Sequence, residues 1–267
     1  MHYIQLYSRF ILIYLKTRLE YRFAFFMDIL IQIITFFVMF LGLWIMLNHF
    51  QTIRGWTFYE VLFLYNLNIL SHGISGMFFM SPMRQLEAMV QNGEFDGILT
   101  RPINPLPLLI FKQFQHAYIG HVLLGIGSLI LCINKLNLEL SGLNIVMLIL
   151  VLIGATLIQS AIMIMTGCVS FWFVKATSLS NTIIYDLRRF LNYPLSIYNK
   201  FIQFLLTFVI PYGFINFYPS LLFLNKEGEV LFTASFQYGT LIVGLLLYML
   251  SITIWSVAVN KYQSTGS

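Results

Sequence analysis

Six long apolar segments alternate with short polar segments along this chain, and nearly every charged residue lies in a polar segment. A helix needs about 20 apolar residues to cross a bilayer, and continuous apolar runs without a period of two predict helices rather than strands. Only helices and closed barrels satisfy their backbone groups in lipid. The pattern therefore predicts six spanning helices, at residues 23–47, 61–80, 117–133, 143–174, 201–217 and 236–259.

Composition indicates one membrane domain and excludes soluble enzymes and nucleic-acid-binding proteins. Hydrophobic residues make up 59% of the chain, charged residues make up 9%, and the mean hydropathy is +0.82. No polar stretch is long enough for a separate soluble domain. Cys132 and Cys168 fall inside predicted spans, where we expect small buried hydrophobic residues. Residues 1–265 are assigned to this domain, and residues 266–267 are interpreted as a cloning remnant.

The distribution of Lys and Arg predicts the orientation, because these residues collect on the cytoplasmic side of membrane proteins. With the amino terminus inside and six crossings, only Arg54, Lys135 and Lys226 of the 15 basic residues lie outside. The opposite orientation inverts this asymmetry. We therefore predict that both termini are cytoplasmic. The net charge of +5 is explained by this asymmetry and needs no nucleic-acid partner.

The first 22 residues mix apolar and basic positions and predict an interfacial helix along the inner leaflet. The alternative is a simple extension of the first span into the cytoplasm. The apolar residues that would share one broad face of this helix are Tyr3, Leu6, Phe10, Ile13 and Tyr14.

The internal loop 81–112 is predicted to begin with a short new helix. Ser81 is a favourable N-cap, Pro82 is favourable at the first helical position, and Gly93 can end the helix in a left-handed conformation. Beyond it, Phe95, Ile98 and Leu99 lie among charged residues and predict an exposed surface for a partner. The alternative is that these apolar residues dip into the membrane interface.

The two loops that flank the predicted fifth span differ in character. Residues 175–200, with Asp186, Arg188 and Arg189, are predicted to form a basic inner loop or a cytoplasmic extension of the neighbouring spans. In residues 210–226, Pro211 and other breakers interrupt an apolar stretch, so the fifth span should stop near Pro211. Residues 212–224 would then fold back into the outer leaflet as short broken helices.

Catalytic and metal-binding motifs are missing from the sequence. It contains no Gly-x-x-x-x-Gly-Lys-[Ser/Thr] phosphate loop, no His-Glu-x-x-His and no Cys-x-x-Cys. His116 and His121 are five residues apart and off one helical face, which disfavours a shared metal. The chain is therefore not expected to bind ATP by a phosphate loop or to be an enzyme.

Polar residues inside two spans form candidate stripes. Asn68, His72 and Gly76 are four residues apart on the second span, where they predict either helix–helix packing or the lining of a substrate path. Asp28 lies about one and a half turns into the first span, with Gln32 farther along the same face. A carboxylate at a helix centre costs about 2.5–3.5 kcal/mol on insertion scales. The shallow depth of Asp28 reduces this cost, and a basic partner from an inner loop would reduce it further.

The order of these elements resembles the permease subunit of type 2 ABC exporters, in a bacterial branch described as ABC-2 family transporter proteins. The resemblance covers nearly the whole chain. It starts at Tyr21 and Arg22, which lead into the first span. The motifs that carry it are residues 55–57 (GWT), 93–96 (GEFD), 99–105 (LTRPINP), 193–198 (YPLSIY) and 210–219 (IPYGFINFYP).

This resemblance implies an all-α integral membrane protein with six transmembrane helices, an N-terminal amphipathic elbow helix and re-entrant helices before the last span. Residues 81–105 would form the cytoplasmic coupling segment. Two permeases would pair in the bacterial cell membrane, as a homodimer or with a sister permease. The chain itself would hold no cofactor, because a separate ABC ATPase subunit would bind ATP and Mg. Drugs, peptides and lipid-linked compounds all stay open as substrates.

Three sets of candidate site residues follow from the resemblance and the polar stripes. The set for coupling to the ATPase is Arg84, Glu87, Glu94, Phe95, Asp96, Ile98 and Arg101. The set for the translocation path is Asp28, Gln32, Asn68, His72 and Gly76. The set for an outer lid over this path is Pro211, Tyr212, Phe214 and Pro219.

Two other classes stay as alternatives. A secondary transporter could be driven by protons through Asp28 and His72, but such carriers commonly have broken helices in both halves, and here only the second half has one. A lipid-active membrane enzyme would need clustered carboxylates, histidines or a metal set near one interface, and the sequence offers none.

Overall fold

The computed structural model describes residues 2–139, 141–173, 176–226, 228 and 231–263, and within them it is helical throughout, with no strand. The predicted all-α class is confirmed. Five helices are long and apolar enough to cross a membrane, or up to six if one bent pair is counted. The α-helices are α1 (His2–Glu20), α2 (Arg22–Phe50), α3 (Phe58–Gln91), α4 (Asp96–Leu99), α5 (Pro105–Lys112), α6 (Ile119–Lys135), α7 (Gly142–Cys168), α8 (Thr177–Asn181), α9 (Lys200–Phe204), α10 (Phe217–Phe223) and α11 (Thr240–Lys261).

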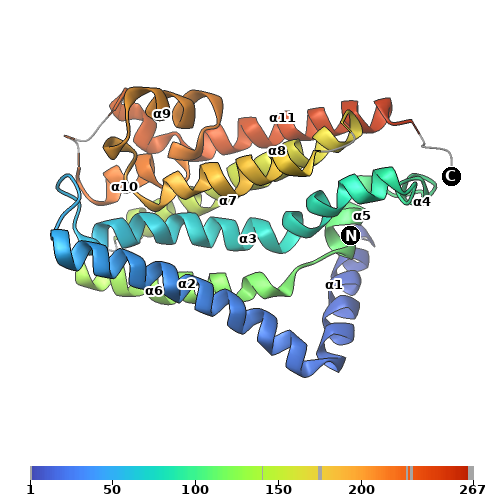
Figure 1. The fold of residues 1–267 in the computed structure, drawn as a ribbon, viewed down its shortest axis with the longest axis horizontal. Helices are drawn as coiled ribbons and strands as arrows, with labels where there is room; N and C mark the ends of the chain where they lie inside the picture. Colours follow the sequence, from blue (N-terminus) through green and yellow to red (C-terminus); the bar gives the residue numbers. More distant parts are fainter. Residues whose placement is uncertain (1, 140, 174–175, 227, 229–230, 264–267) are drawn as a thin grey trace.

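Helix α3 is the centre of the bundle. It lies between α7 and α11 on one side and α2 and α6 on the other (Figure 1). Small residues allow this close packing. A Cβ atom on Gly76 of α3 would lie 2.9 Å from the Tyr118 ring, and one on Gly73 would lie 2.9 Å from Val122 of α6. By contrast, α2 leaves most of its apolar side chains exposed, as expected for a helix that faces lipid.

The N-terminal helix α1 is separate from α2. The two helices meet at a sharp angle at Tyr21 (Figure 1), so α1 is not a straight extension of the first span. Tyr14 anchors α1 by packing against the ring of Phe114, 6.0 Å away. The membrane position of α1 stays a prediction.

The predicted helix start at Ser81 is wrong, because α3 continues without interruption from Phe58 to Gln91 with Pro82 inside it. A proline inside a helix removes one backbone hydrogen bond. Packing on both sides compensates for this loss: Pro82 and Leu86 are buried, and Met83 fits against Gly167 of α7. The predicted end is confirmed, since Gly93 follows the helix in the left-handed region with φ +71°.

Residues 177–192 are not a loop beyond the bundle, which corrects the sequence prediction. They form a nearly continuous helical segment of α8, a π-helical turn and a 3-10 turn, and we call it the 177–192 helix. It runs antiparallel to α3. Thr177 lies beside Glu87, Tyr185 contacts Met80, and the side chain of Asn216 bridges Leu191 and Leu64. The segment therefore extends along most of the length of α3.

The segment that follows, residues 197–225, is tied at both ends to the loop between α2 and α3. Before the segment, Arg54 donates a hydrogen bond to the Ser196 carbonyl at 2.8 Å. After it, Lys226 donates to the Gly55 carbonyl at 2.9 Å and pairs with Glu60 at 3.2 Å. Since both ends lie at the same end of the bundle, the segment enters and leaves from one side.

Residues 201–217 are therefore not the one straight span that the sequence predicts. The helical stretches Lys200–Val209 and Tyr212–Phe223 are bent by 79° at a break, and we call this bent pair the hairpin. The prediction that the helix stops near Pro211 is confirmed, because Val209 is its last helical residue. The hairpin starts earlier than the predicted re-entrant region 212–224, since Lys200 already belongs to it.

Candidate functional site

Two adjoining polar cavities lie where α2 diverges from α3. The one lined by His72 and Arg188 is called the upper cavity and has a volume of about 490 Å³. The one lined by Tyr14 and Asp28 is called the lower cavity and has a volume of about 500 Å³. They share Gln32 of α2, Ser81 and Gln85 of α3, and Gln115 before α6. The upper cavity also reaches the 177–192 helix through Tyr185 and Arg188, which are among its lining residues. Each cavity has a volume typical of a small-molecule site.

The charges that line these cavities are mainly positive. Arg84 and Arg188 line the upper cavity, which has no carboxylate among its lining residues. Arg18 and Lys112 line the lower cavity, together with one carboxylate, Asp28. The other upper-cavity polar groups are the amides of Gln32, Gln85 and Gln115, the hydroxyls of Thr35, Ser81, Tyr118 and Tyr185, and the rings of His72 and His121.

The predicted path residues divide between cavity and packing. Gln32 and His72 line the upper cavity, and Asp28 and Gln32 line the lower one. Asn68 is buried and lines neither cavity. Gly76 makes room for the Tyr118 ring and also lines neither. For Asn68 and Gly76, helix packing is therefore the better interpretation.

Gln159 of α7 joins this part of α3 into a buried hydrogen-bond network. Its Oε1 lies 2.9 Å from His72 Nδ1, and its Nε2 donates to Ser71 Oγ at 2.8 Å and to the Asn68 carbonyl at 3.1 Å. Polar groups in lipid need such partners. Because the network uses one ring nitrogen of His72, it fixes the side of the ring that faces the upper cavity.

Asp28 lies beside a histidine from the segment that precedes α6. His116 Nε2 lies 3.3 Å from the Asp28 carboxylate, and the other ring nitrogen lies 3.3 Å from the Tyr14 hydroxyl. The Phe25 ring stacks on the His116 ring with centroids 4.4 Å apart. His116 therefore connects α1, α2 and the start of α6 at the wall of the lower cavity.

The expected exposed surface at Phe95 and Ile98 is not exposed in the structure. Phe95 has 0% of its surface exposed, and Ile98 has 5%. The Phe95 ring meets those of Phe171, Trp255 and Tyr262, with centroids 5.1 to 6.3 Å apart. Burial of these apolar side chains against the ends of α7 and α11 is favourable, and it leaves neither side chain free to bind a partner directly.

Other members of the predicted coupling set remain on the surface. Glu94 and Arg101 are exposed on either side of α4, and so is Arg84 on α3. Leu99 is 38% exposed. The surface that a partner could contact therefore includes charged side chains, exposed polar residues such as Asn92 and Thr100, and Leu99.

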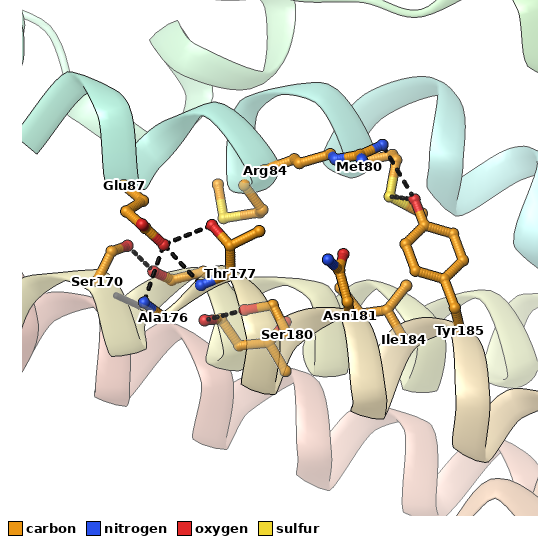
Figure 2. Close-up of a pocket in the computed structure, with 13 residues that line it drawn as sticks. Met80, Arg84, Glu87, Ser170, Ala176, Thr177, Ser180, Asn181, Ile184 and Tyr185 are labelled. Carbon is orange, nitrogen blue, oxygen red and sulfur yellow. Dashed lines mark hydrogen bonds between the residues drawn. The ribbon is translucent and has the colours of Figure 1, made fainter. Parts of the chain in front are cut away.

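Glu87 holds the start of the 177–192 helix. Its Oε2 accepts hydrogen bonds from the backbone N–H groups of Ala176 and Thr177, at 2.9 and 2.6 Å, and from the Thr177 hydroxyl at 2.5 Å (Figure 2). A carboxylate beside unsatisfied N–H groups at a helix start is stabilising. Arg84, one turn earlier, approaches the Tyr185 hydroxyl at 3.5 Å. These two residues link α3 to the 177–192 helix.

The predicted lid residues lie inside the hairpin and line neither polar cavity. Tyr212, Phe214 and Pro219 are buried. The Tyr212 hydroxyl donates to the Ile183 carbonyl at 2.9 Å, and the Phe214 carbonyl accepts from Thr240 at 2.8 Å. The hairpin is thereby attached to both the 177–192 helix and α11. A role as lid stays a proposal.

Sequence reasoning did not assign Tyr118 and His121 to the cavity or Gln159 to the buried network beside it. Each is a polar residue next to or within an apolar run, which is the signal that could have identified it. Arg188 was assigned to a loop because its charge lowers local hydropathy. Within the described ranges, no group of three or more His, Cys, Asp or Glu side chains could hold a metal ion.

Together the helical fold and the largely apolar exposed side chains of α2 are those of a membrane protein, and two polar cavities open between its helices. The family model described as ABC-2 family transporter protein matches residues 33–266. The chain therefore belongs to the ABC-2 transporter family, whose members are the membrane components of ABC transporters and associate with an ABC ATPase. Asp28 and Gln32 precede the matched region. Searches of curated proteins and of solved structures return no match.

Proposed function

We propose that this chain is the permease subunit of an ATP-driven exporter, which moves a drug-like, peptide or lipid-like substrate outward. ATP and Mg would bind only in the separate ATPase subunit. Family membership and the polar cavity support this function. The observation that carries it is that α3 lines the cavity, contains the first part of the predicted coupling segment 81–105, and leads through Gly93 into the rest of it. A movement at that segment would reach the cavity along one rigid element.

In this proposal the membrane is crossed six times, by α2, α3, α6, α7, the 177–192 helix and α11. Both termini are cytoplasmic, and α1 lies along the inner leaflet of the bacterial cell membrane. The revised fifth crossing moves Lys200 outside and places Arg188 and Arg189 within the membrane. Nine basic residues then lie inside and four outside, so the asymmetry still favours this orientation.

Coupling to the ATPase would use the exposed residues of the segment, with Glu94 and Arg101 as its contacts. Asp96, Phe95 and Ile98 would give the segment its shape, and the buried pair would fix it to the ends of α7 and α11. ATP-driven closure of two ATPase subunits would move α3. Glu87 and Arg84 would transmit that movement to the 177–192 helix and change access to the cavity.

A second permease would complete the path, as an identical copy or as a sister chain. Two observations support a partner on this side. The cavities open between helices rather than inside a closed bundle, and the exposed side chains of α2 are largely apolar. The hairpin Lys200–Phe223 would cover the outer end of the path, with Pro211, Tyr212, Phe214 and Pro219 at its bend.

Copurification tests the proposal. An affinity-tagged chain from native membranes should carry an ABC ATPase with it. Reversal of both surface charges, Glu94→Arg with Arg101→Glu, should lower the amount of bound ATPase by about three- to tenfold. Each rim charge is worth about 0–1 kcal/mol, and reversal adds repulsion. The variant should still purify as a folded protein.

The matched control is Lys16→Glu, a charge reversal on the exposed face of α1, which should leave ATPase binding unchanged. If no ABC ATPase copurifies with the wild-type chain, the proposed function fails. If the ATPase binds normally to the double variant, residues 93–105 are not the docking surface.

A further inference from the structure

Arg188 lies at an unusual position for a cation. It belongs to the 177–192 helix and lines the upper cavity. It lies at the level of the middle of α3, because Tyr185 before it contacts Met80 and Leu191 after it lies near Leu64. The nearest carboxylate along the helix, Asp186, is 3.8 Å from Arg189 instead. Within the part of the chain that the structure describes, Arg188 forms no ion pair within 4 Å.

Neutral groups, not carboxylates, surround Arg188. Two tyrosines, Tyr118 and Tyr185, line the same cavity as Arg188. Their hydroxyls can orient around a cation but cannot neutralise it. An ionisable side chain at membrane depth is costly, and such residues mark functional sites. Arg188 therefore keeps a charge that the described part of this chain does not compensate.

The whole cavity region shares this excess of positive charge. Arg18, Arg84, Lys112 and Arg188 line the two cavities. The one carboxylate, Asp28, is already 3.3 Å from His116. Low-dielectric walls focus the resulting field, so the region attracts anions and repels cations.

We infer that the upper cavity binds the anionic headgroup, a phosphate or a carboxylate, of an amphiphilic substrate, with Arg188 as its main ligand. This inference rests on the proposed function, since it names the substrate class of the same cavity. A guanidinium offers a planar fork of donors that matches both groups. The amides of Gln32 and Gln115 and the hydroxyl of Tyr118 supply further donors on the cavity wall.

The amphiphilic character of the substrate is inferred from the surroundings of the cavities. The lower cavity includes Ile31, whose side chain is 53% exposed on the apolar face of α2. A headgroup in the cavity could therefore keep its tail against α2 and the bilayer. A free inorganic anion would gain nothing from this arrangement.

The test uses the purified full-length chain in a neutral detergent and a fluorescent dodecyl phosphate as probe, with binding measured by anisotropy. Arg188→Gln should weaken binding about tenfold, as expected for the loss of a charge-assisted hydrogen-bond pair. Arg188→Lys should weaken it less, because the charge remains. The matched control is Arg189→Gln. Arg189 is the next residue, its side chain is 77% exposed, and it does not line the cavity, so binding should be unchanged.

Competitors identify the source of the anionic group. Displacement of the probe by phosphatidylglycerol would assign the site to a lipid headgroup, and displacement by alkyl carboxylates but not by phosphatidylglycerol would assign it to another anionic amphiphile. Equal binding of dodecyltrimethylammonium, or displacement by inorganic phosphate as strong as by dodecyl phosphate, would overturn the inference. So would unchanged binding to a monodisperse Arg188→Gln protein.

The two proposals fail separately. The binding assay contains no ATPase, so loss of anion selectivity leaves the copurification result intact. Conversely, if the chain binds anions but recruits no ABC ATPase, the proposed ligand site is supported and the proposed exporter function fails. If Arg188→Gln does not fold, the competition between anionic and cationic amphiphiles on the wild-type chain still decides the inference.

Discussion

Phe95→Asp should destabilise the chain by at least about 4 kcal/mol, or prevent its folding, rather than impair partner binding alone. Truncation of a buried Phe costs about 3–5 kcal/mol, and an unpaired buried carboxylate adds to that. The reason is the complete burial of Phe95 against Phe171, Trp255 and Tyr262. Thermal unfolding in detergent measures the loss, and tryptic cleavage at Arg101 reports local release of the segment.

Leu99→Asp is the matched control, because Leu99 is one helical turn away and 38% exposed. Its stability should stay within about 0.5 kcal/mol of wild type. Equal stability of the Phe95→Asp and Leu99→Asp proteins would mean that Phe95 is not buried within its own chain. The sequence-based prediction that Phe95 is exposed to a partner would then be supported.

Gly244→Leu should give the second largest loss, about 2–3 kcal/mol or failure to fold. At the crossing of α7 and α11, a Cβ on Gly154 would lie 2.7 Å from the Leu241 Cα, and one on Gly244 would overlap the backbone of Gly154. Backbone atoms cannot move aside as side chains do, so the two helices would separate. Small residues at such crossings are typical of membrane helices.

Gly42→Leu on α2, by contrast, should not destabilise the chain. A Cβ there meets no atom within 4 Å, and Leu has a higher helix propensity than Gly by up to about 1 kcal/mol. Its melting temperature should therefore be unchanged or higher. If both variants behave alike in a thermal shift assay, the α7–α11 contact is looser than the structure has it.

Local pattern was sufficient where a helix contains a long continuous apolar run. The helices α2, α3, α6, α7 and α11 were all predicted, because continuous apolar runs define them whatever they pack against. The 177–192 helix was missed since it carries Asp186, Arg188 and Arg189. Its polar face lines a cavity, and hydropathy cannot distinguish that situation from exposure to water. The hairpin was predicted as the fifth span instead, because its residues are apolar although they do not form one straight helix.

The site depended on contacts that no local pattern contains. Phe95 among charges looks the same whether its partner is another protein or the far end of its own chain, and here it is the latter. The stripe on α3 was visible, but its division between cavity and packing depended on Gln159, about 90 residues away in sequence. The contact between Asp28 and His116 could be identified only from the structure, because the two residues are far apart in sequence.

The 177–192 helix supports both the path and the anion site, so its crossing of the membrane is the most direct test. Single cysteines at Ser178 and Lys200 mark its two ends in a chain whose own Cys132 and Cys168 are 0% exposed. In intact cells, an impermeant maleimide should label Lys200→Cys, and should label Ser178→Cys only after lysis. Thr52→Cys is the outer reference for this labelling. Protection of Lys200→Cys until lysis would place residues 175–200 inside the cell and contradict the account.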